Sequence, residues 1–169
     1  MNFFITYGTT DYLEKIVNQH TDQKLLLLEN PDTATLFHET EGSSVFNEPK
    51  KYEVLDSTGE MMNGTFAVLN NIPVTQEGRP LFEKRFSERA RLIEKEPGFS
   101  AIRVLRPLAS DTYIILTLWE SEKHFKAWQD SKAYEHAHKK RGTDQGVDQQ
   151  SIFPRPSYVT TYYSVDKED

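Results

Sequence analysis

The chain has 169 residues, with 20 Lys and Arg against 26 Asp and Glu and no cysteine. Its formal net charge of −6, carried by mixed signs, argues against nucleic acid or an anionic membrane as a partner. The lack of cysteine excludes disulfides, thiolate nucleophiles, iron–sulfur ligation and haem–thiolate chemistry.

Residues 1–12 carry no signal-peptide pattern, because they lack a basic start and a long apolar run. No apolar stretch approaches the ~20 residues that are needed to span a bilayer. A chain without cysteine also suits a reducing compartment. These features predict a soluble cytoplasmic protein.

The first half of the chain predicts the order strand, helix, strand, strand. The expected elements are a strand over 2–7, a helix over 11–20 and strands over 24–30 and 33–41. Thr9 or Thr10 is the expected helix cap. Residues 46–60 are more polar and are expected to form a looser segment with one helical turn.

The second half repeats this order more strongly. The expected elements are a strand over 64–76, a helix over 79–96, strands over 99–108 and 112–119, a helix from Phe125 to His138 and a strand over 157–165. Two β-α-β-β units in tandem predict an α+β fold of two ferredoxin-like units packed sheet to sheet. The halves share the order of elements only.

The stretch from Ile114 to Arg141 combines a strand with two apolar faces and an aromatic helix. Ser121 offers an N-cap, and Phe125 and Trp128 follow three residues apart on one side of the helix. His138 comes ten residues after Trp128, about 15 Å along a helix. An apolar groove with one imidazole is an environment that ligates haem iron. The alternative is a packed amphipathic helix with a surface histidine.

Asn70 interrupts an apolar face, because Phe66, Val68, Ile72 and Val74 share its side of the strand by the period of two. A buried amide without a partner costs about 1–3 kcal/mol. Asn70 therefore either satisfies the backbone at a bulge before Pro73 or donates a hydrogen bond inside a ligand cavity. Its neighbour Asn71 points the other way.

Other polar groups carry weaker signals. No two of the five histidines have zinc-site spacing, and the common hydrolase and nucleotide motifs are absent. Five basic residues crowd the helix over 79–96, as a solvent-exposed face or as a site for an anionic ligand tail: Arg79, Lys84, Arg85, Arg89 and Arg91. Residues 142–157 form a long polar loop, expected to be a lid or disordered.

Roughly residues 65–163 resemble the antibiotic-biosynthesis-monooxygenase (ABM) domain family. The matching pieces include FAVLNNIPVTQEGRPLFEKRF, GFSAIRVLRPL, FKAWQDSKAYEHAHK and SYVTTYY. Within that family the chain is most similar to the IsdG-type haem-degrading monooxygenases in their longer bacterial form. The motif of those enzymes is an asparagine on the first strand, then a tryptophan and a histidine ten residues apart. These fall here on Asn70, Trp128 and His138.

The resemblance implies a haem oxygenase activity in iron homeostasis, with haem as both substrate and cofactor. His138 would be the axial ligand to haem iron, Trp128 would push the porphyrin out of plane, and Asn70 would donate a hydrogen bond at the iron. O2 and electrons from an external donor would open the porphyrin and release iron.

The resemblance also implies a fold of the dimeric α+β-barrel type. Short family members pair two chains into one barrel, whereas this chain has an extra N-terminal unit that lacks the three site residues. We expect residues 1–60 to replace a second subunit and residues 61–169 to form the ABM domain with the haem site, giving a monomer. Two other functions stay open: a cofactor-free ABM oxygenase acting on an aromatic or quinone substrate, and a non-catalytic haem-binding or stress-signalling protein.

Overall fold

The computed structural model describes residues 1–89, 91–131 and 152–165. Within them the β-α-β-β order occurs twice, with two short 3-10 turns (η). The elements are β1 (Asn2–Gly8), α1 (Thr10–Gln19), β2 (Lys24–Glu29), β3 (Ala34–Thr40), β4 (Lys50–Gly59), η1 (Met61–Asn63), β5 (Phe66–Pro73), α2 (Arg79–Ser87), η2 (Leu92–Lys95), β6 (Phe99–Pro107), β7 (Thr112–Trp119), α3 (Glu122–Gln129) and β8 (Tyr158–Ser164).

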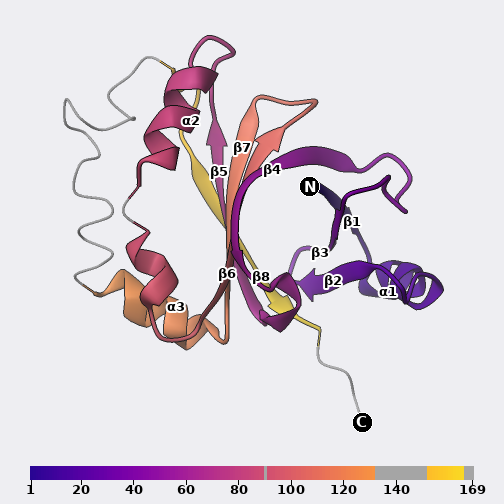
Figure 1. Ribbon diagram of the computed structural model, residues 1–169. Coiled ribbons are helices and arrows are strands. Elements are labelled where there is room, and N and C mark those ends of the chain that lie inside the picture. Colours follow the sequence, from indigo (N-terminus) through magenta and orange to yellow (C-terminus); the bar gives the residue numbers. More distant parts are fainter. Residues whose placement is uncertain (90, 132–151, 166–169) are drawn as a thin grey trace.

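The eight strands form one closed antiparallel barrel in the order β1-β3-β2-β8-β5-β7-β6-β4. The α+β class and the barrel of two tandem units are thereby confirmed. The sheets of the two β-α-β-β units join edge to edge, through the pairs β4–β6 and β2–β8. The sequence alone predicted instead that the two sheets pack face to face. Helix α1 lies on one side of the barrel, and α2 and α3 lie on the opposite side (Figure 1).

Side-chain alternation divides the core into an interior and outer layers. In β7, Ile114, Leu116 and Leu118 point into the barrel and join one cluster with residues of both halves. Tyr113 and Ile115 point outward to the cluster at α2, and Trp119 points outward to the cluster at α3. This explains why β7 is apolar on both faces, as the sequence predicted.

The helix starts also agree with the sequence. Thr9 caps α1 by accepting a hydrogen bond from the Tyr12 amide, and Ser121 caps α3 by accepting one from the His124 amide.

Two predicted elements are wrong. Residues expected to be loose contain the ten-residue strand β4, because β1 and β6 pair with its two edges. The helix expected over 79–96 ends at Ser87. Arg91 then adopts a left-handed conformation with φ 58°, and η2 follows.

Candidate functional site

Asn70 lies half-buried near the middle of β5, on the outer face of the barrel. Its register partners are Ile115 on β7 and Val159 on β8. The β5–β7 pairing runs without a register shift from Phe66 to Pro73, so the expected bulge is absent. The Asn70 amide makes no hydrogen bond to any described residue, which leaves its donors and acceptor available to a ligand.

Asn71 lies on the opposite face, inside the barrel, and its amide nitrogen has three hydrogen-bond acceptors. Its Nδ2 donates to the carbonyl oxygens of Leu69 (3.1 Å) and Tyr158 (3.2 Å) and to Thr160 Oγ1 (3.3 Å). Asn71 is 7% exposed, and its bonds fasten β8 to β5. The two neighbouring amides therefore have separate roles, one structural and one available.

Trp128 lies in α3 and packs against the same outer face as Asn70. It is 8% exposed, and its ring centroid lies 5.7 Å from Trp119 and 5.9 Å from Phe125. Its cluster includes Val68, the residue that precedes Asn70 on this face of β5. Because residues two apart on a strand are about 7 Å apart, the structure brings Asn70 and the Trp128 cluster together.

His138 and most of the 142–157 loop lie outside the described residues, so the expected iron ligand and lid remain predictions. The described end of that loop packs at α2, where Ile152 and Phe153 join the outer cluster. The Ile152 carbonyl accepts a hydrogen bond of 2.7 Å from the Thr75 amide.

Val159 lies at the candidate site, and the sequence did not single it out. It is 59% exposed and lies directly beside Asn70 on β8. Alternation along the last strand could have placed it on this face, had the register between β8 and β5 been known. An exposed valine beside an available amide gives a surface that suits a ligand that is apolar with one polar centre.

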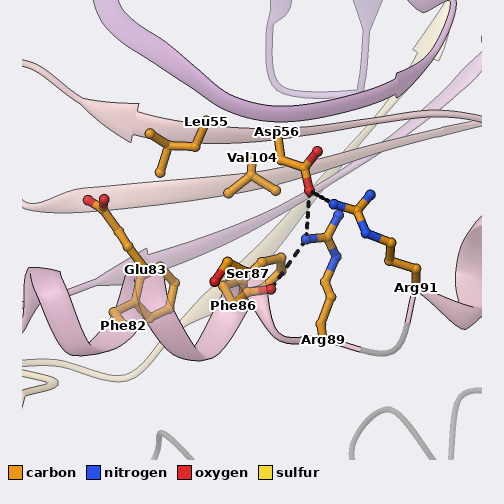
Figure 2. Close-up of a pocket in the computed structure, with 9 residues that line it drawn as sticks. All are labelled: Leu55, Asp56, Phe82, Glu83, Phe86, Ser87, Arg89, Arg91 and Val104. Atoms are coloured by element: carbon orange, nitrogen blue, oxygen red, sulfur yellow. Dashed lines mark hydrogen bonds and ion pairs between the residues drawn. The ribbon is translucent and has the colours of Figure 1, made fainter.

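A cavity of about 240 Å³ lies on the same outer face, between α2 and strands β4 and β6. Phe82 and Phe86 line it from α2 and Val104 lines it from β6, and Arg89 and Arg91 both bind Asp56 at one end (Figure 2). In register, Val104 lies opposite Ile115, which lies opposite Asn70. The cavity is thus two strands away from Asn70, about 10 Å.

The basic residues at α2 are not simply a solvated face. The Arg89 side chain is only 16% exposed and stacks on Phe86, with 4.9 Å between the guanidinium carbon and the ring centroid. Arg79 donates to the carbonyl oxygens of Pro107 and Ser110 and so holds the β6–β7 turn. The prediction of an exposed helix face is therefore wrong for Arg89.

A partly buried polar network attaches α2 to the sheet. The Tyr113 hydroxyl donates to Glu83, and Arg106 donates to the same carboxylate. The hydrogen bond from Arg106 holds the pKa of Glu83 below its ordinary value, and burial raises that of Tyr113. These groups position α2 over β6 and β7.

In residues 1–89, 91–131 and 152–165, no group of His, Cys, Asp and Glu is arranged to hold a metal ion. No helix in this described part of the chain is both long and apolar enough to cross a membrane.

Comparison with known proteins places this site in a family. The family model for antibiotic biosynthesis monooxygenases matches residues 65–140, which include Asn70, Trp128 and His138. A Staphylococcus epidermidis relative, "Signal transduction protein TRAP", is 30% identical over 115 residues, 68% of this chain and 69% of its own length. The chain belongs to the antibiotic biosynthesis monooxygenase family.

Two further comparisons cover almost the whole chain. A "Heme-degrading monooxygenase" from Listeria monocytogenes is 26% identical over 158 residues, 92% of this chain and 95% of its own length. A solved structure of "a major regulator of staphylococcal pathogenesis" superposes with a TM-score of 0.85 at 23% identity, covering 98% of this chain and all of that one. The second comparison supports the fold alone.

The described residues fit haem as a ligand of this ABM site. A flat, largely apolar ring system matches the indole of Trp128 and the exposed side chain of Val159. A polar centre matches the amide of Asn70, which has no hydrogen-bond partner among the described residues. The iron ligand would have to come from His138.

Proposed function

We propose that this chain is a haem-degrading monooxygenase. It takes haem as substrate and cofactor and, with O2 and electrons from an external donor, opens the porphyrin and releases iron. The observation that carries the proposal is the Asn70 amide, which lies on an apolar outer face beside the Trp128 cluster without a partner among the described residues. The Listeria relative named as a heme-degrading monooxygenase supports the same function.

Each site residue has one task in this proposal. Haem, when bound, supplies the iron that activates oxygen. His138 would hold the iron through an imidazole nitrogen. Asn70 Nδ2 would donate a hydrogen bond to a ligand bound beside it and so orient that ligand.

Trp128 acts as a rigid wall against the ring face. Trp119 and Phe125 pack against its indole, and the Ser121 cap fixes the start of its helix. An indole that cannot move away transfers strain to a flat ligand pressed against it. The surrounding apolar cluster also excludes water from this side of the site.

The proposal includes a monomer in which residues 1–60 take the place of a second subunit. The outer face of the N-terminal half is filled by its own side chains, since Phe46 and Phe4 pack on the buried His38. One haem site per chain is therefore expected. Sedimentation that shows a stable dimer would contradict the monomer.

Haem titration followed by a reductant tests the function. Wild type should develop a Soret band on haem addition and lose it with ascorbate in air. His138→Ala should lose the Soret shift, whereas His124→Ala, which changes a partly exposed histidine on α3, should keep it. Asn70→Ala and Trp128→Phe should keep binding and slow the Soret loss by roughly tenfold or more.

Two other functions predict different results. One is a non-catalytic haem-binding or stress-signalling protein, and the staphylococcal relative named for signal transduction supports its signalling part. In that case the Soret band persists under ascorbate and air. For a cofactor-free oxygenase acting on an aromatic or quinone substrate, His138→Ala leaves ligand binding and turnover intact.

A further inference from the structure

An unbroken row of aromatic rings runs from Trp128 to the protein surface. Trp128 contacts Phe125 with 5.9 Å between ring centroids, Phe125 contacts Phe66 at 5.9 Å, and Phe66 contacts Tyr163 at 5.1 Å. Trp119 lies beside the row, 5.7 Å from both Trp128 and Phe125. These spacings are those of rings in direct contact.

The row ends at a phenol that has a proton acceptor. Tyr163 is 42% exposed, and its hydroxyl donates to Glu122 Oε1 at 2.9 Å. The second carboxylate oxygen of Glu122 lies 3.6 Å from Lys126 Nζ. A carboxylate within hydrogen-bond distance can take the phenolic proton as the phenol loses an electron.

The other end of the row is where oxidising equivalents would arise. The chain has two tryptophans, Trp119 and Trp128, and both belong to this aromatic cluster. Trp119 Nε1 donates to Thr117 Oγ1 at 3.1 Å, so its indole is held in place. Any one-electron oxidation of tryptophan in this protein therefore begins either at Trp128, in the row, or at Trp119, which contacts both Trp128 and Phe125.

We propose that the row carries oxidising equivalents away from Trp128 to Tyr163. The electron leaves the Tyr163 phenol and reduces the oxidised indole, and the phenolic proton passes to Glu122. A solution reductant then returns one electron to Tyr163, and Glu122 returns the proton. The natural oxidant is haem with hydrogen peroxide, so this use of the row rests on the proposed function. Peroxide takes up two electrons and two protons to give two water molecules.

A haem-free experiment tests the transfer itself. Azide radicals made by pulse radiolysis take one electron from tryptophan and become azide anion; the oxidised indole releases its N–H proton to form the indolyl radical and regains a proton from water when it is reduced. In wild type the indolyl absorbance should decay as tyrosyl absorbance rises, at a rate independent of protein concentration. Tyr163→Phe should slow this decay roughly tenfold or more. Tyr158→Phe removes a more exposed tyrosine of the same strand and should leave the rate unchanged.

Glu122→Gln tests the proton acceptor, because it keeps a hydrogen-bond acceptor but cannot take the proton at neutral pH. In this variant the tyrosyl absorbance should rise more slowly than in wild type, although Tyr163 itself is unchanged. Equal rates in wild type and Tyr163→Phe, with both proteins folded by circular dichroism, would overturn the proposal. Equal slowing by Tyr158→Phe would do so as well, because it would show unspecific transfer.

Haem-loaded protein tests the use of the row. After one equivalent of peroxide, electron paramagnetic resonance should show a tyrosyl radical in wild type and in Tyr158→Phe but not in Tyr163→Phe. Peptide mass spectrometry should then find more oxidised Trp128 in Tyr163→Phe. Absence of a Soret shift would refute the proposed function and leave the azide result standing. The use of the row would be refuted if both proteins show a Soret shift while wild type and Tyr163→Phe give the same tyrosyl radical signal and the same amount of oxidised Trp128.

Discussion

At the residue scale, the neighbouring amides Asn70 and Asn71 differ in their hydrogen bonds, and the proposed site depends on that difference. Strand alternation in the sequence predicted that the two amides point to opposite faces, and the structure confirms it. The sequence could not show which amide is satisfied, because the three acceptors of Asn71 come from β5 itself and from β8, almost ninety residues away. These hydrogen bonds depend on how β5 pairs with β8, which the sequence does not show.

Replacing each amide should separate stability from function. Asn71→Ala leaves the Tyr158 carbonyl and Thr160 hydroxyl without their donor inside the barrel, so it should lower the free energy of unfolding by about 1–3 kcal/mol. Asn70→Ala removes no hydrogen bond to a described residue and should change it by less than about 0.5 kcal/mol. Urea unfolding monitored by tryptophan fluorescence measures both. Equal losses would contradict this assignment.

His38 should make stability depend on pH. Its side chain is buried, Nε2 lies 2.8 Å from Gln23 Oε1, and no partner within the described residues reaches Nδ1. Burial, and secondarily the nearby His20, hold the pKa of His38 below its ordinary value of about 6.5.

The unfolded chain therefore binds more protons than the folded chain as pH falls below about 6.5. The contribution of His38 to stability is complete above that pH and declines below it. His38→Phe, which keeps an aromatic ring between Phe4 and Phe46, should lack this part of the decline. The difference in unfolding free energy between the two proteins, measured across pH, should be flat above about 6.5 and change below it.

At the element scale, strongly patterned segments were predictable and segments fixed by distant partners were not. Strand β7 has the predicted bounds, because its apolar run is unambiguous. Strand β4 has a mixed sequence and becomes a strand through pairing with β1 and β6. Helix α2 ends early in a region where Arg89 and Arg91 reach Asp56 on β4. Neither the pairing of β4 nor the ion pairs to Asp56 can be recognised from the residues nearby in the sequence.

Gly98 sets the position of α3 relative to β6. It has φ +82°, and a Cβ atom there would lie 2.2 Å from His124 Cγ. Its carbonyl also accepts a 2.8 Å hydrogen bond from the Glu120 amide, next to the α3 cap. Gly98→Ala should therefore destabilise the protein by about 1–3 kcal/mol through backbone strain and displace α3.

Gly42→Ala is the matched control, since its Cβ would meet no atom closer than 3.7 Å and its φ is not positive. Thermal unfolding should separate the two variants. A change in tryptophan emission should accompany Gly98→Ala alone, because Trp128 lies on α3. Unchanged stability in Gly98→Ala would show that His124 and the backbone relax without strain.

At the scale of the whole molecule, a buried ion pair joins the two halves inside the barrel. Arg103 on β6 donates through Nε and Nη2 to Glu39 on β3, at 2.5 and 3.3 Å, with side chains 5% and 7% exposed. The remaining guanidinium donors reach the carbonyl oxygens of Thr58, Gly59 and Ile102. Every donor is used, so the pair has a single arrangement.

Replacing one partner of this ion pair should destabilise the protein far more than replacing both partners. Arg103→Met leaves the Glu39 carboxylate buried and unpaired, and should cost about 3–5 kcal/mol of stability. The double variant Arg103→Met, Glu39→Leu should recover most of that loss. Arg155→Met, which removes an exposed pair with Asp111, should have little effect. Additive losses in the double variant would show that the two charges do not depend on each other.

The sequence predicted the tandem units and the α+β class from the order of elements, and the resemblance to the ABM family supplied the barrel. It also predicted Asn70 and Trp128 as site residues; their roles stay a prediction, and the structure places both on one face. It could not reveal the Arg103–Glu39 pair or Val159, because both depend on registers between strands far apart in the chain. His138 lies outside the described residues and stays a prediction.

The barrel closes within a single polypeptide, through β4–β6 on one side and β2–β8 on the other. Its closure is therefore a unimolecular equilibrium, which dilution does not shift, whereas a barrel shared by two chains falls apart below its dissociation constant. A cell can keep such a protein at very low copy number without losing its architecture. The two halves are also free to diverge, since a substitution in one is not copied into the other.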